Sequence, residues 1–188
     1  MTMFSSPDVL TDTPVVNVPN EAVALPYAER TGIVEIESRF GAVALDYTKP
    51  LLFAKGILGM PENQRYCLIP YPSKRFAHFR LLHCLDDDTL GFITLPFAQH
   101  NLIIAHADLM EAMNAVNMIP EYTSLLLVVN VYREMNSVRM SVNARAPILI
   151  DQRTRHAEQY VLRNNAYLVR HMLRDDFTTI NIDGTQTT

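Results

Sequence analysis

Short runs in which apolar and polar side chains alternate with a period of two are the feature that most constrains the fold of this chain. In residues 33–40, Val34 and Ile36 fall on one face of an extended chain, and Glu35 and Glu37 fall on the other. This period is typical of a half-buried β-strand. The runs of this kind are residues 33–40, 42–47, 66–69, 76–85, 90–95, 125–133, 138–142, 147–150 and 157–162. Short strands at such close spacing predict a small antiparallel barrel or sandwich.

One segment has a helical period instead. Its apolar side chains recur three and four residues apart, at Leu109, Ala112, Met113 and Val116. Asp108 is expected to be the N-cap, and Glu111, three residues later, can complete an arrangement like a capping box. Methionine fits irregular gaps in a core, and this is the role we expect for Met110, Met113 and Met118.

Proline content and charge divide the chain into three parts. Residues 1–30 contain Pro7, Pro14, Pro19 and Pro26, and prolines at this density interrupt both helices and ladders. We therefore expect a disordered N-terminal extension over residues 1–30, an ordered β domain over residues 31–174 and a flexible C-terminal tail over residues 175–188. The formal net charge of −4 conceals a basic segment, because residues 145–174 contain six arginines and only two acidic residues. A net acidic chain is nevertheless a poor starting point for nucleic-acid binding.

Cysteine and histidine residues often act in catalysis or bind metals, but in this chain their spacing suits neither role. Cys67 and Cys84 lack a CxxC partner, and the histidines form no close pair with an acid on one helix face. We interpret Asp86–Asp88 as a solvated turn and Lys55–Gly59 as a turn with glycines at positive φ. The sequence therefore predicts no metal site, no cofactor and no enzymatic activity.

The chain also lacks the segments that direct proteins to membranes or secretion. The first basic residue is Arg30, so no basic start precedes an apolar signal region. No apolar run approaches the roughly 20 residues that a membrane-spanning helix needs. Two cysteines cannot form a disulfide framework, and we expect a cytoplasmic protein.

An arginine-rich stretch, residues 140–162, remains as the candidate for function. We expect two strands joined by a turn at residues 151–154, with Arg and Gln side chains outward and Ile, Val and Leu side chains inward. Such a surface is either an ordinary solvated sheet face or a recognition surface, because the guanidinium group suits carboxylates and protein interfaces. The chemistry alone leaves both interpretations open.

At these residues the sequence resembles the bacterial flagellar assembly factor family, FliW. The family pattern Val-Asn-Leu-Lys/Arg-Ala-Pro-Ile-Val-Ile-Asn, followed by a Thr-Arg pair, is similar to residues 142–151 and 154–155. Two residues depart from the pattern: Met60 stands where relatives usually have Phe, and Ala157 where they have Gly. The resemblance covers about residues 33–173, and its further matches are Arg39-Phe40-Gly41, Phe53, Gly56-Ile57, Gly59, Leu90-Gly91-Phe92, Pro96, Gln159, Val161-Leu162 and Tyr167–His171.

The resemblance implies a compact, mainly β fold, an antiparallel β-barrel or roll with one or two short helices. It also implies a protein that binds flagellin and, when free of it, binds the translational regulator CsrA and antagonises it away from its RNA-binding surface. Asn143 and Pro147 have structural alternatives, since the first can fix a bend and the second can set strand entry. On this basis we expect partner contacts at Asn143, Arg145, Arg155 and Gln159, and structural roles at Phe40, Gly41, Gly56, Gly59, Pro96 and Pro147.

Two other functions remain open at this point. Basic side chains in residues 145–163 could hold a phosphate, as in a small-ligand-binding barrel of the flavin or cyclic-dinucleotide type with no flagellin role. Direct RNA binding is the third hypothesis, and it predicts a steep loss of affinity as salt rises.

Overall fold

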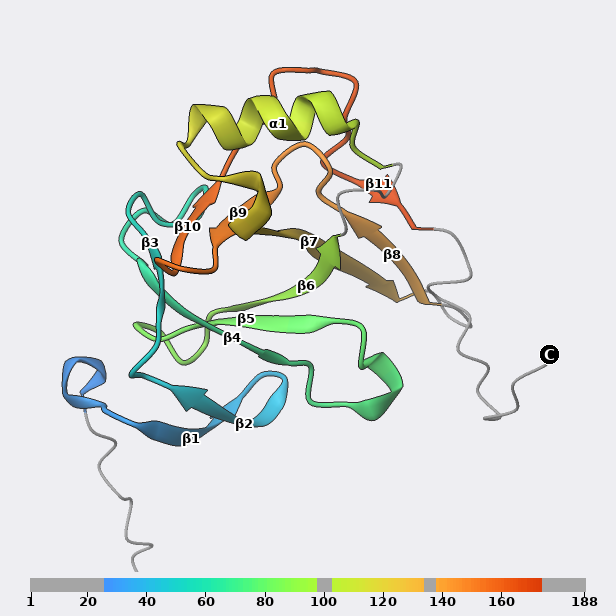
Figure 1. Cartoon of the computed structure of the whole chain (residues 1–188). Helices are drawn as coiled ribbons and strands as arrows, with labels where there is room; N and C mark the ends of the chain where they lie inside the picture. The colour runs from blue at the N-terminus through green and yellow to red at the C-terminus, as the bar shows by residue number, and fades with distance from the viewer. Residues whose placement is uncertain (1–25, 98–102, 134–137, 174–188) are drawn as a thin grey trace, which may run out of the picture.

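A long strand, β7 (Thr123–Arg133), organises the computed structural model, which describes residues 26–97, 103–133 and 138–173. Its first half closes a barrel, because it pairs with β6 on one side and with β9 on the other. Within the described residues this barrel has seven strands in the order β7-β6-β5-β4-β3-β10-β9 (Figure 1). The remaining barrel strands are β3 (Leu51–Phe53), β4 (Arg65–Pro70), β5 (Arg80–Cys84), β6 (Gly91–Phe97), β9 (Ile148–Asp151) and β10 (His156–Gln159). The predicted mainly β barrel is therefore confirmed.

The barrel departs from the predicted antiparallel pattern at one place among the described strands. β3 and β10 run parallel, with Leu52 opposite His156 and Phe53 opposite Ala157. β3 is too short to show a period in the sequence, and it was not predicted. It joins the strands from the two halves of the chain and completes the closure.

Apolar side chains form three layers, one inside the barrel and two outside it. The interior is filled from all sides by residues such as Phe53, Tyr66 and Ile148. One outer face is covered by α1 (His106–Ala115), which buries Leu109, Ala112 and Met113. The opposite side is covered by a hairpin of β1 (Ile33–Ser38) and β2 (Gly41–Asp46), and Figure 1 shows the helix and this hairpin on opposite sides of the barrel.

The helix begins earlier than predicted. Ala105 is the N-cap, so the prediction that Asp108 caps the helix is wrong. Asp108 lies within the first turn, and its carboxylate accepts hydrogen bonds from Asn164 and Tyr167 instead. The prediction that the methionines fill the core is confirmed, because Met113 and Met118 are buried and Met110 packs against the same cluster. The other helical segments are the 3₁₀ turns η1 (Tyr27–Glu29), η2 (Lys74–Phe76) and η3 (Pro120–Tyr122).

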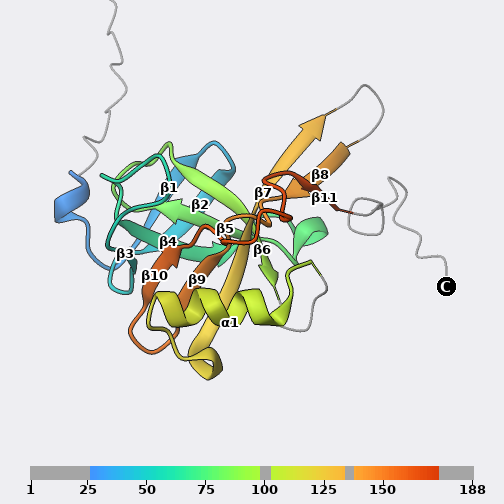
Figure 2. The same cartoon turned by 90° about the horizontal axis from the view of Figure 1, so that it is seen from above.

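The second half of β7 leaves the barrel and forms a ribbon with β8 (Val138–Val142) and β11 (His171–Met172). Figure 2 shows the β7–β8 hairpin projecting from the barrel. We call β8, β11 and the end of β7 the ribbon. The strands predicted at residues 125–133 and 138–142 are confirmed, and residues 134–137 between them lie outside the described residues.

The alternating run at residues 90–95 predicts a strand that stops before Pro96, but β6 continues to Phe97. Pro96 lies inside β6, opposite Leu126 of β7. The ladder between β5 and β6 ends at the pair Arg80–Thr94. Beyond that pair β6 has a described neighbour on one side only, which is β7, so a residue without an N–H is tolerated there.

The folded part of the chain starts before residue 31. Arg30 is 8% exposed, and its guanidinium forms two hydrogen bonds with the Asp88 carboxylate, at 2.7 and 2.9 Å. Arg30, which the sequence prediction places in the N-terminal extension, therefore packs on the domain. Residues 1–25 and 175–188, the rest of the two predicted tails, lie outside the described residues, and so does residue 174 at the end of the predicted domain.

Candidate functional site

The ribbon has two faces of different chemistry. Because side chains alternate along a strand, Val131 and Arg133 of β7 lie on one face and Tyr132 lies on the other. The paired strand β8 follows the same alternation, with Met140 on the first face and Arg139 on the second. Each face overlies a hollow in the surface.

The first face overhangs an open groove of about 640 Å³. The groove opens where β6 and β7 separate, and Val131 and Val138 on its ribbon side are 42% and 43% exposed. Arg39 and Arg133 are the charged residues of its lining. The other lining residues are apolar or aromatic: Phe40, Tyr71, Phe76, Phe79, Ile93, Val131, Val138 and Met140.

Four aromatic rings form the floor of this groove. The ring centres of Phe40 and Tyr71 are 6.3 Å apart, those of Tyr71 and Phe76 are 6.0 Å apart, and those of Phe76 and Phe79 are 6.1 Å apart. The first two of these pairs have edge-on geometry, an arrangement that aromatic pairs favour. The floor is therefore continuous from the β1–β2 turn to the start of β5.

Phe40 reaches the groove because the β1–β2 turn is tight. The Ser38 hydroxyl donates to the Gly41 carbonyl at 2.8 Å and accepts from the Phe40 N–H at 3.1 Å. Gly41 has φ of 96°, a conformation that favours glycine. The ring then lies against Gly91, where an added Cβ would be 3.0 Å from Phe40 Cε2. The tight turn and the contact with Gly91 fit the structural roles expected for Phe40 and Gly41.

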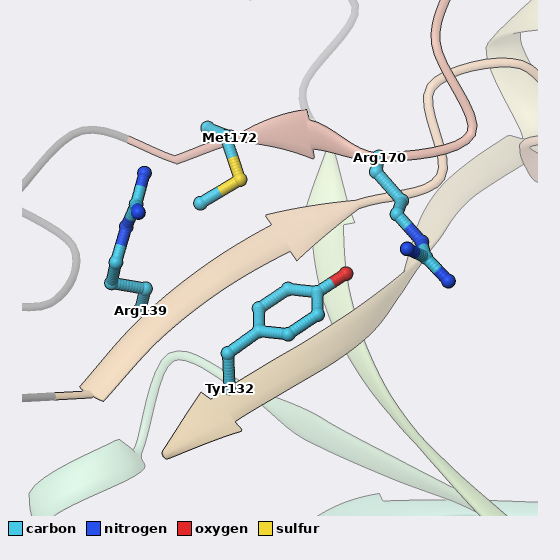
Figure 3. Close-up of a pocket in the computed structure, with 4 residues that line it drawn as sticks. All are labelled: Tyr132, Arg139, Arg170 and Met172. Atoms are coloured by element: carbon cyan, nitrogen blue, oxygen red, sulfur yellow. The ribbon is translucent and has the colours of Figure 1, made fainter. Parts of the chain in front are cut away.

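The second face of the ribbon carries a smaller, basic hollow of about 280 Å³. Figure 3 shows its side chains: Tyr132 from β7, Arg139 from β8, Met172 from β11 and Arg170 from the turn just before β11. The Tyr132 hydroxyl is 3.2 Å from the Ser141 hydroxyl, which holds the ring over the ribbon.

The end of β7 has one edge along which no described strand pairs. The β6–β7 ladder ends at Thr94–Val128, whereas β7 continues beside β8. On the far side of β8, the Met140 carbonyl accepts a hydrogen bond from Leu173 at 2.9 Å. Met140 and its partner Val131 are therefore a non-hydrogen-bonded pair of the β7–β8 ladder. It follows that the N–H and C=O of Val131 point away from β8, towards the open edge.

Three of the four predicted partner-contact residues lie around a single turn. The side-chain oxygen of Asn143 accepts hydrogen bonds from the backbone N–H groups of Arg145 and Ala146, at 3.1 and 3.0 Å. Gln159 donates to the Ala146 carbonyl at 3.2 Å and accepts from the Leu58 N–H at 3.2 Å. The Arg145 guanidinium bonds to Asn164 and Asn165. These contacts hold the turn together, and partner binding by the three residues stays a prediction.

Arg155 lies at the opposite end of β10. Its guanidinium donates to the Pro50 carbonyl at 3.1 Å and to the Lys49 carbonyl. Its φ is 59°, in the left-handed region. The Leu52 N–H donates to the Arg155 carbonyl at 2.9 Å, which begins the parallel β3–β10 pair. Arg155 thus fixes the chain before β3 against β10, and its predicted partner contact is untested.

The remaining motif residues occupy turns and strand starts. Gly56 and Gly59 have φ of 65° and 88°, which confirms the predicted turn with positive φ. Pro147 is buried immediately before β9, and its carbonyl accepts from the Tyr160 N–H at 3.0 Å. Both observations fit the structural roles that the sequence predicted.

The described residues contain no cluster of three or more His, Cys, Asp or Glu side chains that could hold a metal ion. Both cysteines are buried and free, and burial raises the pKa of Cys84 to about 11. Asp86 and Asp88 are engaged by Arg65 and Arg30. Within the described chain, no helix is long and apolar enough to cross a membrane.

Strands β7 and β8 were predicted from the sequence, but the projection of their ends from the barrel and the groove beside them were not. Val131 and Val138 are in phase with the buried residues Val129 and Met140, so alternation alone assigns them to a core. The one sequence signal was the Tyr167–His171 match, which ends at β11. That match gave no indication of a groove.

The closed barrel, the covering helix and the projecting ribbon define a class of small β-barrel proteins. The same fold occurs in a solved structure described as the crystal structure of the flagellar assembly factor FliW. It aligns over 74% of this chain and 96% of that one, with a TM-score of 0.56 and 20% sequence identity. A family model described as FliW protein matches residues 35–173. The chain therefore belongs to the FliW family.

Individual relatives are similar over the same region. The flagellar assembly factor FliW of Syntrophus aciditrophicus (strain SB) is 29% identical over 140 residues, which are 71% of this chain and 83% of the relative. That of Clostridium novyi (strain NT) is 31% identical over 124 residues, which are 64% of this chain and 82% of the relative. These comparisons confirm the resemblance found in the sequence.

Proposed function

We propose that this chain is a non-enzymatic flagellar assembly factor that binds flagellin in the cytoplasm. The observation that carries the proposal is the family match over residues 35–173, which includes the barrel, the helix and the ribbon. When flagellin is exported, the free factor binds a CsrA-type regulator away from its RNA-binding surface and relieves repression of flagellin translation. The two partners exclude each other, so one removes free factor from the other by mass action.

The test uses the purified full chain with flagellin and CsrA from the same organism, separately and together. We expect a stable complex with each protein alone and displacement of CsrA when flagellin is added. Size-exclusion chromatography with mass determination measures both outcomes. Failure of correctly folded chain to bind flagellin would contradict the central claim, and a ternary complex would contradict exclusive binding.

The small-ligand alternative gains no support from the arginines that suggested it. Within residues 145–163, Arg145 and Arg155 bond to neighbouring backbone carbonyls, and Arg153 and Arg163 pair with Asp151 and Glu111. A rise in melting temperature with flavin or a cyclic dinucleotide would reverse this judgement.

A further inference from the structure

The groove under the ribbon combines an apolar floor with a positive rim. Arg39 and Arg133 are both exposed, and the described lining contains no acidic residue. The Arg39 guanidinium lies 4.7 Å from the centre of the Phe40 ring and donates to the Gly91 carbonyl. Both of these partners are uncharged, so they leave the positive charge of Arg39 available to a ligand. An acidic ligand is therefore favoured at the rim.

The open edge of β7 lies along the same groove. The N–H and C=O of Val131 point towards this edge, and the Val131 side chain lines the groove beside it. Unpaired strand edges recruit extended segments of other chains through main-chain hydrogen bonds, while neighbouring pockets select the side chains. The groove has both features in one place.

We infer that the groove binds an extended segment of the protein partner by strand addition to the end of β7. Large apolar side chains of that segment pack on the floor formed by Phe40, Tyr71 and Phe76, and acidic side chains at its flanks meet Arg39 and Arg133. The inference rests on the proposed function in taking flagellin as the partner. The basic hollow on the reverse face is smaller and has no aromatic floor, so it fits this ligand less well.

The first experiment neutralises the rim. Isothermal titration calorimetry measures binding of purified flagellin to the full chain and to the double variant Arg39→Gln, Arg133→Gln. We expect roughly tenfold weaker binding and a smaller dependence on salt. The matched control is Lys55→Gln, Arg163→Gln, which removes the same charge at side chains 78% and 77% exposed and outside the groove lining. The control is expected to bind as the unaltered chain does.

The second experiment tests the strand edge. Val131→Pro removes an N–H that points to the open edge, and it spares the hydrogen bonds to β8. Val131→Ala keeps that N–H and shortens only the side chain. We expect the proline variant to lose at least tenfold more affinity than the alanine variant. Thermal unfolding checks both folds, and if the proline variant does not fold, the rim variant and overlapping synthetic peptides of the flagellin decide the question.

Each outcome has a defined meaning. If the unaltered chain binds no flagellin, the proposed function fails and this inference fails with it. If the unaltered chain and the rim variant bind equally well, the inference alone is overturned. A loss with the rim variant but none with a folded proline variant overturns strand addition. The effect of the rim variant could also come from this chain itself occupying the groove. If deletion of residues 174–188 abolishes that effect, or if it follows from self-association measured by sedimentation, the inference is overturned.

Discussion

Gly56, in the turn after β3, has no room for a side chain. Its φ is 65°, and an added Cβ would lie 2.3 Å from the Met60 carbonyl oxygen and 2.7 Å from Pro61 Cα. Both neighbours are backbone atoms, so the turn itself has to move. We expect Gly56→Ala to lower the free energy of unfolding by about 3 kcal/mol, measured by urea denaturation.

Gly59 provides the matched control in the same turn. Its φ of 88° is equally unusual, but nothing lies within 4 Å of an added Cβ. Gly59→Ala is therefore expected to cost only the conformational penalty, about 1 kcal/mol. Equal losses for the two variants would show that the close approach at Gly56 contributes nothing.

Tyr66 has a buried hydroxyl for which the described residues provide no hydrogen-bond partner. Its ring packs on Phe53 inside the barrel, with centres 5.0 Å apart, and burial raises the pKa of the phenol. An unsatisfied buried hydroxyl costs free energy, so Tyr66→Phe is expected to raise the free energy of unfolding by about 1 kcal/mol. Urea denaturation measures the change. Tyr66→Leu, which removes the ring contact as well, should instead lower it by about 2 kcal/mol, and a loss with phenylalanine would reveal a partner for the hydroxyl.

At the scale of elements, barrel closure depends on the turn between β9 and β10. Arg155 holds the Lys49 and Pro50 carbonyls while its own φ is 59°. We expect Arg155→Ala to lower the free energy of unfolding by about 2 kcal/mol, because the hydrogen bonds are lost and alanine is strained in the left-handed region. Arg155→Gly also loses the hydrogen bonds but relieves the strain, so it should be about 1 kcal/mol more stable than the alanine variant. The reverse order in thermal unfolding would contradict this account.

The elements that the sequence predicted well are those with enough residues to show a period. Alternation identified β1, β2, β7 and β8 because each presents one face to a core over five or more residues. β3 and β11 have only three and two residues, which no periodic pattern can reveal, and both are positioned by pairing with strands distant in sequence. Asp108 misled the helix prediction because its carboxylate bonds to Tyr167, a partner nearly 60 residues away. Arg145, Arg155 and Gln159 were predicted to contact a partner, and this stays a prediction. No local pattern shows that their side chains hold turns of the barrel.

The whole molecule combines a closed barrel with a ribbon that has an open edge. Residues 123–128 of β7 pair with β9, with β6 or with both, whereas its end and β8 leave the barrel. Amide hydrogens in such weakly supported segments exchange through local openings, and these cost less free energy than the openings that a closed barrel requires. We expect hydrogen exchange to be faster for residues 129–133 and 138–140 than for β4 and β5. On addition of flagellin, the added protection should concentrate in the ribbon, and protection confined to α1 would place the contact elsewhere.

The position at which the folded unit begins can be tested by truncation. Arg30 joins the segment before β1 to the Asp86–Asp88 turn through its paired hydrogen bonds to Asp88, and it also donates to the Tyr47 hydroxyl at 2.9 Å. A chain that starts at Pro26 keeps these contacts, and one that starts at Thr31 loses them and leaves Asp88 without its partner. We expect the shorter chain to be less stable by about 2 kcal/mol, since hydrogen bonds to charged groups contribute more than neutral ones. Arg30→Ala in the chain that starts at Pro26 should reproduce this loss in urea denaturation. Equal stability of the two truncated chains would instead support a domain boundary at residue 31.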